Sequence, residues 1–133
     1  MTVAELMQRN VKTVGSETSI AEAIVSLVDA HISGMPVVDG MGNVIGVLSS
    51  TDVLTAEAEA DDPAARRALF EDSAVRDIMT PRPYTIMPSE DIREAARLML
   101  YADVHRLFVA EGDQLVGIIS TTDLVRAIAT GRL

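Results

Sequence analysis

The sequence repeats itself at a spacing of about 72 residues, and this repeat limits the possible folds more than any other feature. Residues 3–7 (VAELM) correspond to residues 75–79 (VRDIM). Residues 46–52 (GVLSSTD) correspond to residues 117–123 (GIISTTD). The second copy has one residue fewer between these two matching segments than the first copy has. Because the matches keep the same order and nearly the same offset, the chain contains two copies of one structural unit.

The first helix of each copy is predicted from its start signal and its hydrophobic spacing. Ser19 with Glu22 has the pattern of a capping box, and Asp91 with Glu94 repeats the pattern in the second copy. Apolar residues then recur at helical spacing, which is typical of a helix with one buried face.

Two short apolar runs follow this helix in each copy. Residues 35–38 and 44–48 flank a turn that contains glycine, and residues 107–110 and 115–119 repeat the arrangement. The pattern predicts a β-hairpin, followed by a second helix. One copy alone would bury too little apolar surface to be stable by itself in water. We therefore expect an α/β (α+β) fold in which the two copies pack sheet against sheet.

The two copies are joined by a linker. We assign residues 1–54 and 75–133 to the copies and residues 55–74 to an acidic, helical linker. Asp-Pro at residues 62–63 predicts a helix start, and residues 64–71 are expected to be helical. The linker is interpreted as a solvated connecting helix, with a docking surface for a partner as the alternative.

The composition disfavours several classes of protein. The chain has no cysteine, which removes disulfides, thiolate metal sites and thiol nucleophiles. A net charge of −9 disfavours a nucleic-acid partner. No apolar run approaches the ~20 residues that span a bilayer, and the acidic N-terminus is unlike a signal peptide. We expect a cytoplasmic protein that has no membrane partner.

Nothing in the sequence indicates catalysis or a metal site. No Ser-His-Asp grouping or carboxylate pair is recognisable, and His31 and His105 stand in unrelated places. His31 ends the first helix and is interpreted as a C-terminal cap or a surface residue rather than a ligand. Four methionines fit apolar positions and are expected to fill gaps in the core: Met7, Met79, Met87 and Met99.

The repeated element Gly-x-x-Ser-x-x-Asp is the candidate site. It lies where a strand ends and a helix begins, so that free backbone N–H groups and the helix dipole favour a phosphate. Ser49 and Ser120 add a hydroxyl donor, and Asp52 and Asp123 can accept hydrogen bonds from the vicinal hydroxyls of a ribose. The alternative is an ordinary helix cap with nothing bound. Its presence in both copies favours a site, although duplication can preserve a cap equally well.

Together these motifs resemble a pair of CBS domains (cystathionine-beta-synthase-type repeats), which form a Bateman module. The resemblance covers residues 3–54 and 75–130 and rests on Val-x-x-Leu/Ile-Met, the threonine before the first helix, residues 33–38 (SGMPVV) and both Gly-x-x-Ser-x-x-Asp elements. It implies two β-α-β-β-α units related by pseudo-twofold symmetry, with two clefts between them. Such clefts typically hold AMP, ADP, ATP or S-adenosylmethionine.

The resemblance also implies which residues form the two sites, because each cleft of the family commonly combines the adenine-side residues of one unit with the Ser-x-x-Asp of the other. The first site would comprise Thr13, Ser33, Gly34, Met35, Pro36, Ser120 and Asp123. The second site would comprise Thr85, His105, Arg106, Leu107, Ser49 and Asp52. Where the family has a hydrophobic residue followed by proline, the second copy has Leu107 and Phe108, which alters the base pocket.

The two expected sites differ in charge. Residues 104–108 (VHRLF) resemble a strand of the gamma subunit of AMP-activated protein kinase, where His and Arg face nucleotide phosphates. His105 and Arg106 therefore imply anion affinity at the second site, whereas the Ser-Gly pair at residues 33–34 carries no charge. The alternative places Arg106 at the surface, paired with Asp103, and His105 half-buried in its strand.

We expect a non-catalytic regulatory module that binds an adenine nucleotide and signals to an unidentified protein partner. No cofactor is expected to be required, although ATP could need Mg²⁺ because the protein is acidic. The alternative is a structural or dimerising module without a physiological nucleotide, and a homodimer is expected because modules of this family often pair through aliphatic helix faces. A regulatory piece of a larger enzyme or transporter is a third interpretation, disfavoured by the Met1 start and the helical finish at residues 127–133.

Overall fold

The computed structural model describes residues 1–132, and the chain forms two compact units. The central unit is one continuous segment, Lys12–Pro83. The terminal unit combines Met1–Val11 with Tyr84–Leu133. Each unit contains one β-sheet with its helices, which confirms the expected mixed fold with two sheets.

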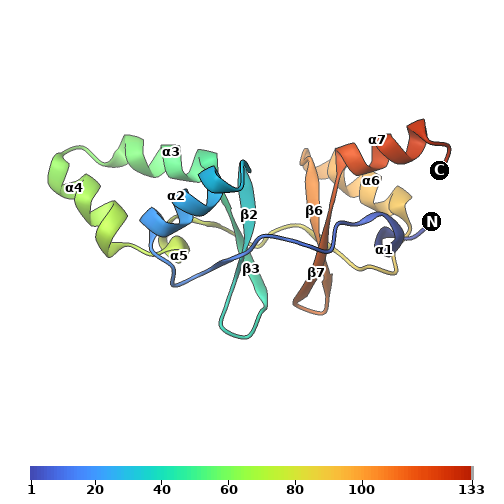
Figure 1. Ribbon diagram of the computed structural model, residues 1–133, viewed down its shortest axis with the longest axis horizontal. Helices are drawn as coiled ribbons and strands as arrows, with labels where there is room; N and C mark the ends of the chain where they lie inside the picture. The colour runs from blue at the N-terminus through green and yellow to red at the C-terminus, as the bar shows by residue number, and fades with distance from the viewer. Residues whose placement is uncertain (133) are drawn as a thin grey trace. The chain divides into compact units, whose positions relative to one another are not determined.

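The central unit holds a four-stranded sheet in the order β1-β2-β3-β4. Its strands are β1 (Val14–Gly15), β2 (Gly34–Val38), β3 (Val44–Ser49) and β4 (Thr80–Pro81). Strand β1 is parallel to β2, and the other pairs are antiparallel. Its two longer helices, α2 (Ile20–Asp29) and α3 (Ser50–Glu59), lie together beside the β2–β3 hairpin (Figure 1).

The terminal unit repeats this arrangement with a three-stranded sheet in the order β5-β6-β7. Its strands are β5 (Thr85–Ile86), β6 (Arg106–Glu111) and β7 (Gln114–Ser120), and its longer helices are α6 (Ile92–Ala102) and α7 (Thr121–Ala129). The register repeats as well, because Val14 lies opposite Val37 in one sheet and Ile86 lies opposite Val109 in the other.

The two sequence copies exchange their first helices. Helix α1 (Val3–Leu6) contacts α6, α7 and β7, so it completes the terminal unit (Figure 1). Helix α5 (Val75–Ile78) contacts α3 and β3 and completes the central unit. Val3 and Val75 are fully buried in these positions. The compact units are therefore not the same segments as the sequence copies, whose boundaries stay predictions.

The cores are aliphatic, as a chain with few aromatic residues requires. In the terminal unit the buried cluster comprises Val3, Met7, Ile86, Ile92, Ala95, Met99, Leu107, Val109, Ile119 and Leu124. In the central unit it comprises Val14, Ala23, Leu27, Met35, Val37, Leu48 and Val75, with Met79 packed against it. The core placement of Met87 is wrong. Its side chain is 53% exposed because it follows β5 and leads into a turn at Pro88.

The helix ends follow the sequence signals only in part. The side chains of Ser19 and Asp91 cap α2 and α6 as predicted. Asp91 accepts its hydrogen bond from the Arg93 N–H, at 2.8 Å, and Glu94 pairs with Arg97 instead of returning to the cap. His31 follows α2 in the left-handed region, with φ 54°, and is exposed, so it is a surface residue at the helix C-terminus.

The linker is helical but not one regular helix. Asp62 caps α4 (Pro63–Arg67) by accepting a hydrogen bond from the Ala65 N–H at 2.7 Å. The next turn, Ala68–Asp72, is a π-helical turn (η1) and packs against α2. The α-helix therefore ends four residues before the predicted limit at residue 71, where the chain turns its half-buried Leu69 and Phe70 toward the unit. Among residues 1–132, none of the helices has the length and apolar character needed to cross a membrane.

Two glycines allow the backbone after α1 (residues 7–8) and after α5 (residues 79–80) to lie against the hairpins. These are the exchanged segments. A Cβ atom added to Gly46 would lie 2.9 Å from the Thr80 carbonyl oxygen and 2.6 Å from Met79 Sδ. A Cβ atom added to Gly117 would lie 2.8 Å from the Gln8 carbonyl oxygen and 2.7 Å from Met7 Sδ. Because backbone oxygens cannot move as a flexible side chain can, both positions require glycine.

We predict that Gly117→Ala and Gly46→Ala each destabilise the protein by about 1–3 kcal/mol, the usual effect of overpacking. Gly40→Ala is the matched control, because a Cβ atom there meets nothing within 4 Å. Urea unfolding followed by circular dichroism measures the difference. Equal stability of the Gly117→Ala and Gly40→Ala variants would contradict the close approach of the Gln8 carbonyl to Gly117.

Asp91 makes the stability of α6 sensitive to acid. The hydrogen bond from the Arg93 backbone N–H holds the pKa of Asp91 below its ordinary value of 3.8. Its contribution is therefore complete above the unfolded pKa and is lost as the pH falls through the folded pKa. Ser19 is the equivalent cap in the other unit, so Asp91→Ser keeps a cap but removes the titration. We expect Asp91→Ser to lose less stability than the unmodified protein between pH 5 and pH 2, measured by thermal unfolding.

Candidate functional site

Both Ser-x-x-Asp elements lie at a helix N-terminus, in nearly identical geometry. Ser49 is the N-cap of α3, and Asp52 Oδ2 accepts hydrogen bonds from the Ser49 N–H (2.9 Å) and the Ser49 hydroxyl (3.0 Å). Ser120 is the N-cap of α7, and Asp123 Oδ2 accepts the same two bonds at 2.9 and 3.0 Å. Each aspartate N–H donates back to the serine hydroxyl. The capping function predicted as the alternative is therefore present in both units.

The strand residues expected on the adenine side lie beside these caps. Gly34 is the register partner of Ser49, and the Ser50 N–H donates to the Ser33 carbonyl at 2.8 Å. In the terminal unit, Arg106 is the register partner of Ser120, and the Thr121 N–H donates to the His105 carbonyl at 2.9 Å. Ser-Gly in one unit and His-Arg in the other thus occupy equivalent places next to a helix N-terminus.

The threonines of the motif lie at the outer strand of each sheet. Thr85 is the register partner of Phe108, at the start of β5. Thr13 directly precedes β1 and is exposed. Met35 and Leu107, the expected base-side aliphatic residues, are instead buried in the cores of their own units.

The structure distributes the expected site residues between the units. The central unit holds Thr13, Ser33, Gly34, Met35, Pro36, Ser49 and Asp52. The terminal unit holds Thr85, His105, Arg106, Leu107, Ser120 and Asp123. Each of the two expected groupings draws on both units, and both groupings stay predictions.

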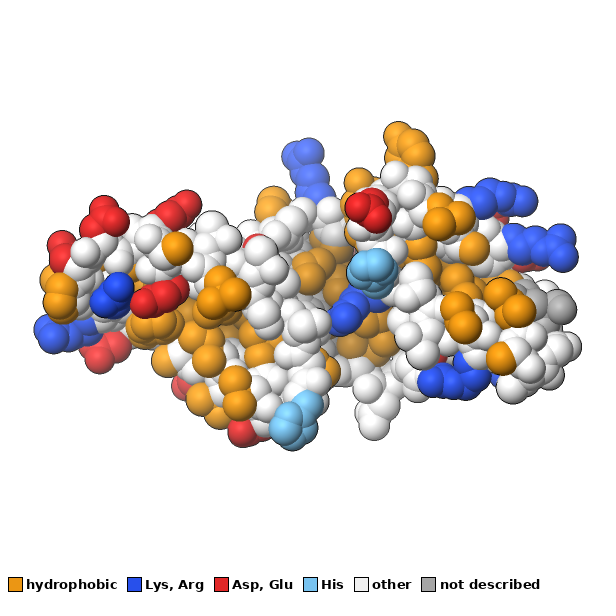
Figure 2. Space-filling model, turned by 90° about the horizontal axis from the view of Figure 1, so that it is seen from above, with side chains coloured by type: hydrophobic (Ala, Val, Ile, Leu, Met, Phe, Trp, Pro, Cys, Tyr) orange, Lys and Arg blue, Asp and Glu red, His pale blue; other side chains and the backbone are white. Residues whose placement is uncertain are grey.

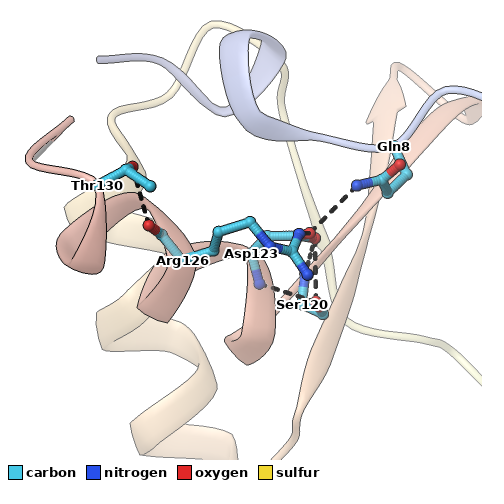
Figure 3. A network of polar contacts seen from close by, with 5 residues as sticks. All are labelled: Gln8, Ser120, Asp123, Arg126 and Thr130. Atoms are coloured by element: carbon cyan, nitrogen blue, oxygen red, sulfur yellow. Dashed lines mark hydrogen bonds and ion pairs between the residues drawn. The ribbon is translucent and has the colours of Figure 1, made fainter.

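Two further polar residues hold the aspartates, and the sequence analysis missed them. Thr80 Oγ1 donates to Asp52 Oδ1 at 3.0 Å, and Gln8 Nε2 donates to Asp123 Oδ1 at 3.2 Å (Figure 3). Both belong to the exchanged segments that follow α1 and α5. The signal was present in the repeat, because Gln8 and Thr80 align directly after the Leu/Ile-Met pair.

The two carboxylates differ in their surroundings. Asp123 is 5% exposed, and Arg126 Nη1 lies 3.6 Å from its Oδ1 (Figure 3). Asp52 is half-buried, and the residue equivalent to Arg126 is Thr55. The carboxylate of the central unit is therefore the more open of the two.

This arrangement provides groups that can bind a ligand. Carboxylate oxygens accept hydrogen bonds from hydroxyl groups, and the adjacent helix N-terminus favours an anion. The nearby His105 and Arg106 add donors that suit a phosphate. A compound that carries both a vicinal diol and an anionic group matches these features.

Comparison with protein-family models finds the CBS domain twice, at residues 3–59 and 75–130. The chain belongs to the CBS-domain family. The matches cover both sequence copies and include each Gly-x-x-Ser-x-x-Asp element.

Several relatives are similar over nearly the whole chain. The CBS domain-containing protein CBSX2 of Arabidopsis thaliana, a chloroplastic protein, is 30% identical over 95% of this chain and 63% of its own length. Protein MJ1225 of Methanocaldococcus jannaschii is 28% identical over 96% of this chain and 43% of its own length. The chain thus spans less than two thirds of these curated relatives.

Solved structures show the same fold. The structure of CBSX2 in complex with AMP has a TM-score of 0.83 and 30% identity, and the match covers 99% of this chain and 98% of that chain. The CBS domain pair of protein MJ0100, in complex with 5′-methylthioadenosine and S-adenosyl-L-methionine, has a TM-score of 0.79 and 23% identity, with 98% of both chains covered. The second match supports the fold alone.

We predict that Ser120→Ala and Ser49→Ala each cost about 1 kcal/mol of stability, because each removes an N-cap hydroxyl. Thr122→Ala is the control, since Thr122 lies exposed in the same turn as Ser120 and caps nothing. The free energy of unfolding in urea is the measurement. A Ser120→Ala variant as stable as Thr122→Ala would show that the cap contributes nothing.

Proposed function

We propose that this chain is a non-catalytic regulatory module that binds an adenine nucleotide and passes the binding state to a protein partner. The observation that carries the proposal is the doubled Ser-x-x-Asp at a helix N-terminus, with Asp52 Oδ1 and Asp123 Oδ1 left outside the capping bonds to serine. The likeness to CBSX2, which was solved with AMP, supports the same class of ligand.

The proposed roles follow from the chemistry of each side chain. Asp52 and Asp123 hold the ribose hydroxyls, and Ser49, Ser120 and Arg106 meet phosphate. The base is proposed to lie beside β2 and β6, against the backbone of Met35, Pro36 and Leu107, because the side chains of these residues are buried. The residues proposed to bind are Thr13, Ser33, Gly34, Met35, Pro36, Ser49, Asp52, Thr85, His105, Arg106, Leu107, Ser120 and Asp123.

Charge influences the choice of nucleotide. A protein with a net charge of −9 repels a highly charged anion unless local donors or a bound cation compensate. AMP is therefore favoured over free ATP, and ATP is proposed to bind with Mg²⁺. S-adenosylmethionine stays a candidate because it also carries the ribose diol. The partner protein and a cytoplasmic location remain proposals.

The second candidate function is dimerisation, and the helix faces favour it. Each unit has an apolar groove between its two longer helices, about 450 Å³ between α2 and α3 and about 390 Å³ between α6 and α7. Leu54 and Leu100 line these grooves and are 68% and 84% exposed. Hydrophobic side chains are visible over the helices of each unit (Figure 2). These grooves suit a twofold dimer, because such a dimer uses the same surface patch on both protein molecules.

Titration calorimetry on protein stripped of ligand tests the nucleotide proposal with AMP, ADP, Mg·ATP and S-adenosylmethionine. We expect AMP to bind, and Asp52→Ala or Asp123→Ala to weaken binding at one site about tenfold or more, because a charged hydrogen-bond acceptor is lost. Asp77→Ala is the control, since Asp77 caps α5 through the Ala74 N–H without belonging to the expected sites. Absence of heat with all four compounds would exclude the proposal, and unchanged affinity in both variants would exclude the residue assignment.

Sedimentation velocity with and without AMP tests the dimer. We expect Leu54→Glu and Leu100→Glu to produce monomers, because a charge would be buried in the interface. Met41→Glu is the control, since Met41 is an exposed hydrophobic residue in the turn between β2 and β3. A dimer whose sedimentation does not change with any nucleotide would favour the purely structural function. Unmodified protein that is monomeric at all concentrations would exclude the dimer.

A further inference from the structure

The chain enters its two units through the same backbone contacts. In the central unit, the Ile20 N–H donates to the Ser73 carbonyl at 3.4 Å. In the terminal unit, the Ile92 N–H donates to the Met1 carbonyl at 3.1 Å. A single antiparallel bridge follows directly in both units. Met1 therefore holds in the terminal unit the position that Ser73 holds in the central unit.

The segment directly before Ser73 covers part of α2. Turn η1 packs against this helix, and the side chains of its Leu69 and Phe70 are half-buried. In the terminal unit the described chain reaches the equivalent point at Met1. The start of α6 therefore has no cover equivalent to η1 among residues 1–132.

An apolar groove of about 490 Å³ lies along α6 at this place. One end is formed by Glu90, whose carbonyl accepts a hydrogen bond from the Val3 N–H at 2.8 Å. The apolar residues of the groove include Met87, Leu98 and Tyr101. Since the side chains of Met87 and Tyr101 are 53% and 87% exposed, the groove is open to a further chain.

The apolar residues of this groove do not replace the cover that η1 gives to α2. The central unit has Gly15, Ser26 and Asp29 at the positions of Met87, Leu98 and Tyr101, so its apolar side chains at this place come from the linker. In the terminal unit the surface itself is apolar. Side chains that filled the place of η1 would be buried, whereas the side chain of Tyr101 is largely exposed.

We propose that this groove is a docking site for a protein partner, which inserts a short helical turn that carries a leucine next to an aromatic residue. The linker is the precedent, because η1 presents Leu69 and Phe70 to the central unit. Apolar contact determines the fit, since Glu94 and Arg97 at the groove pair with each other. A helix laid into an apolar groove is a common mode of peptide recognition. The inference goes beyond nucleotide binding and rests on the proposed function only in requiring a partner.

The linker also provides the test. A copy of residues 62–72 (DPAARRALFED) is placed before Met1, so that Met1 follows it as Ser73 follows the original. We expect the copy to pack into the groove and the unfolding equilibrium constant in urea to fall about fivefold or more, because two apolar side chains leave water. The methyl NMR signal of Met87 should shift. The signal of Met41, which is exposed in the turn between β2 and β3, should not.

Two controls are matched to this extended chain. The same copy with both Leu69→Ser and Phe70→Ser should change neither the stability nor the Met87 signal. Tyr101→Asp, which introduces the residue type of the central unit, is expected to remove most of the stability gained from the original copy. Leu100→Glu is expected to leave that gain unchanged, because Leu100 lines the other groove, between α6 and α7.

The outcomes decide between the possible occupants. Equal stability of the chains that carry the Leu-Phe and Ser-Ser copies would overturn the proposal. If the Met87 signal of unmodified protein shifts as the protein concentration is raised, and Tyr101→Asp prevents the shift, a second copy of the chain occupies the groove and the partner proposal is wrong. Because no nucleotide enters these measurements, failure of the groove would leave the nucleotide proposal standing, and absence of nucleotide binding would leave the groove result unchanged.

Discussion

The backbone that follows each short N-terminal helix lies directly against a glycine of a β-hairpin, Gln8 on Gly117 and Thr80 on Gly46. These two contacts secure the exchange of α1 and α5 between the sequence copies. They also place the side chains of Gln8 and Thr80 on the two aspartates, because each residue meets the hairpin next to a helix N-terminus. The packing of α1 and α5 into the two cores depends on this close approach, and so do the hydrogen bonds that Asp52 and Asp123 accept from Thr80 and Gln8.

The same carboxylates serve stability and, in the proposed function, binding. Asp52 and Asp123 each satisfy the first turn of a helix through one oxygen, and the second oxygen is directed to an exchanged segment. Binding at the second oxygen would leave the capping bonds intact. A ligand could thus be added to this structure without unfolding either helix, and by mass action it would stabilise the folded state.

Much of the fold could be predicted from the sequence, because the signals were local or repeated. The helix starts at Ser19, Asp62 and Ser120 follow from capping chemistry, and the hairpins follow from apolar runs around glycine turns. The exchange of α1 and α5 could not be predicted, because the repeat is equally consistent with helices that stay in their own copy. The covering of Asp123 was missed for the same reason, since Gln8 is distant in sequence and reaches it only through that exchange.

The exchange also affects the order in which the units can form. The central unit, Lys12–Pro83, is continuous and can complete its contacts once those residues have been synthesised. The terminal unit needs Met1–Val11 together with the segment that begins at Tyr84. The first residues synthesised therefore cannot reach their final contacts until the last segment of the chain has been synthesised. Contacts over such long sequence separations slow folding because their chain entropy is lost before they are formed. A chain cut between its two copies would yield fragments that each contain parts of both units, so that neither unit is complete until the fragments associate.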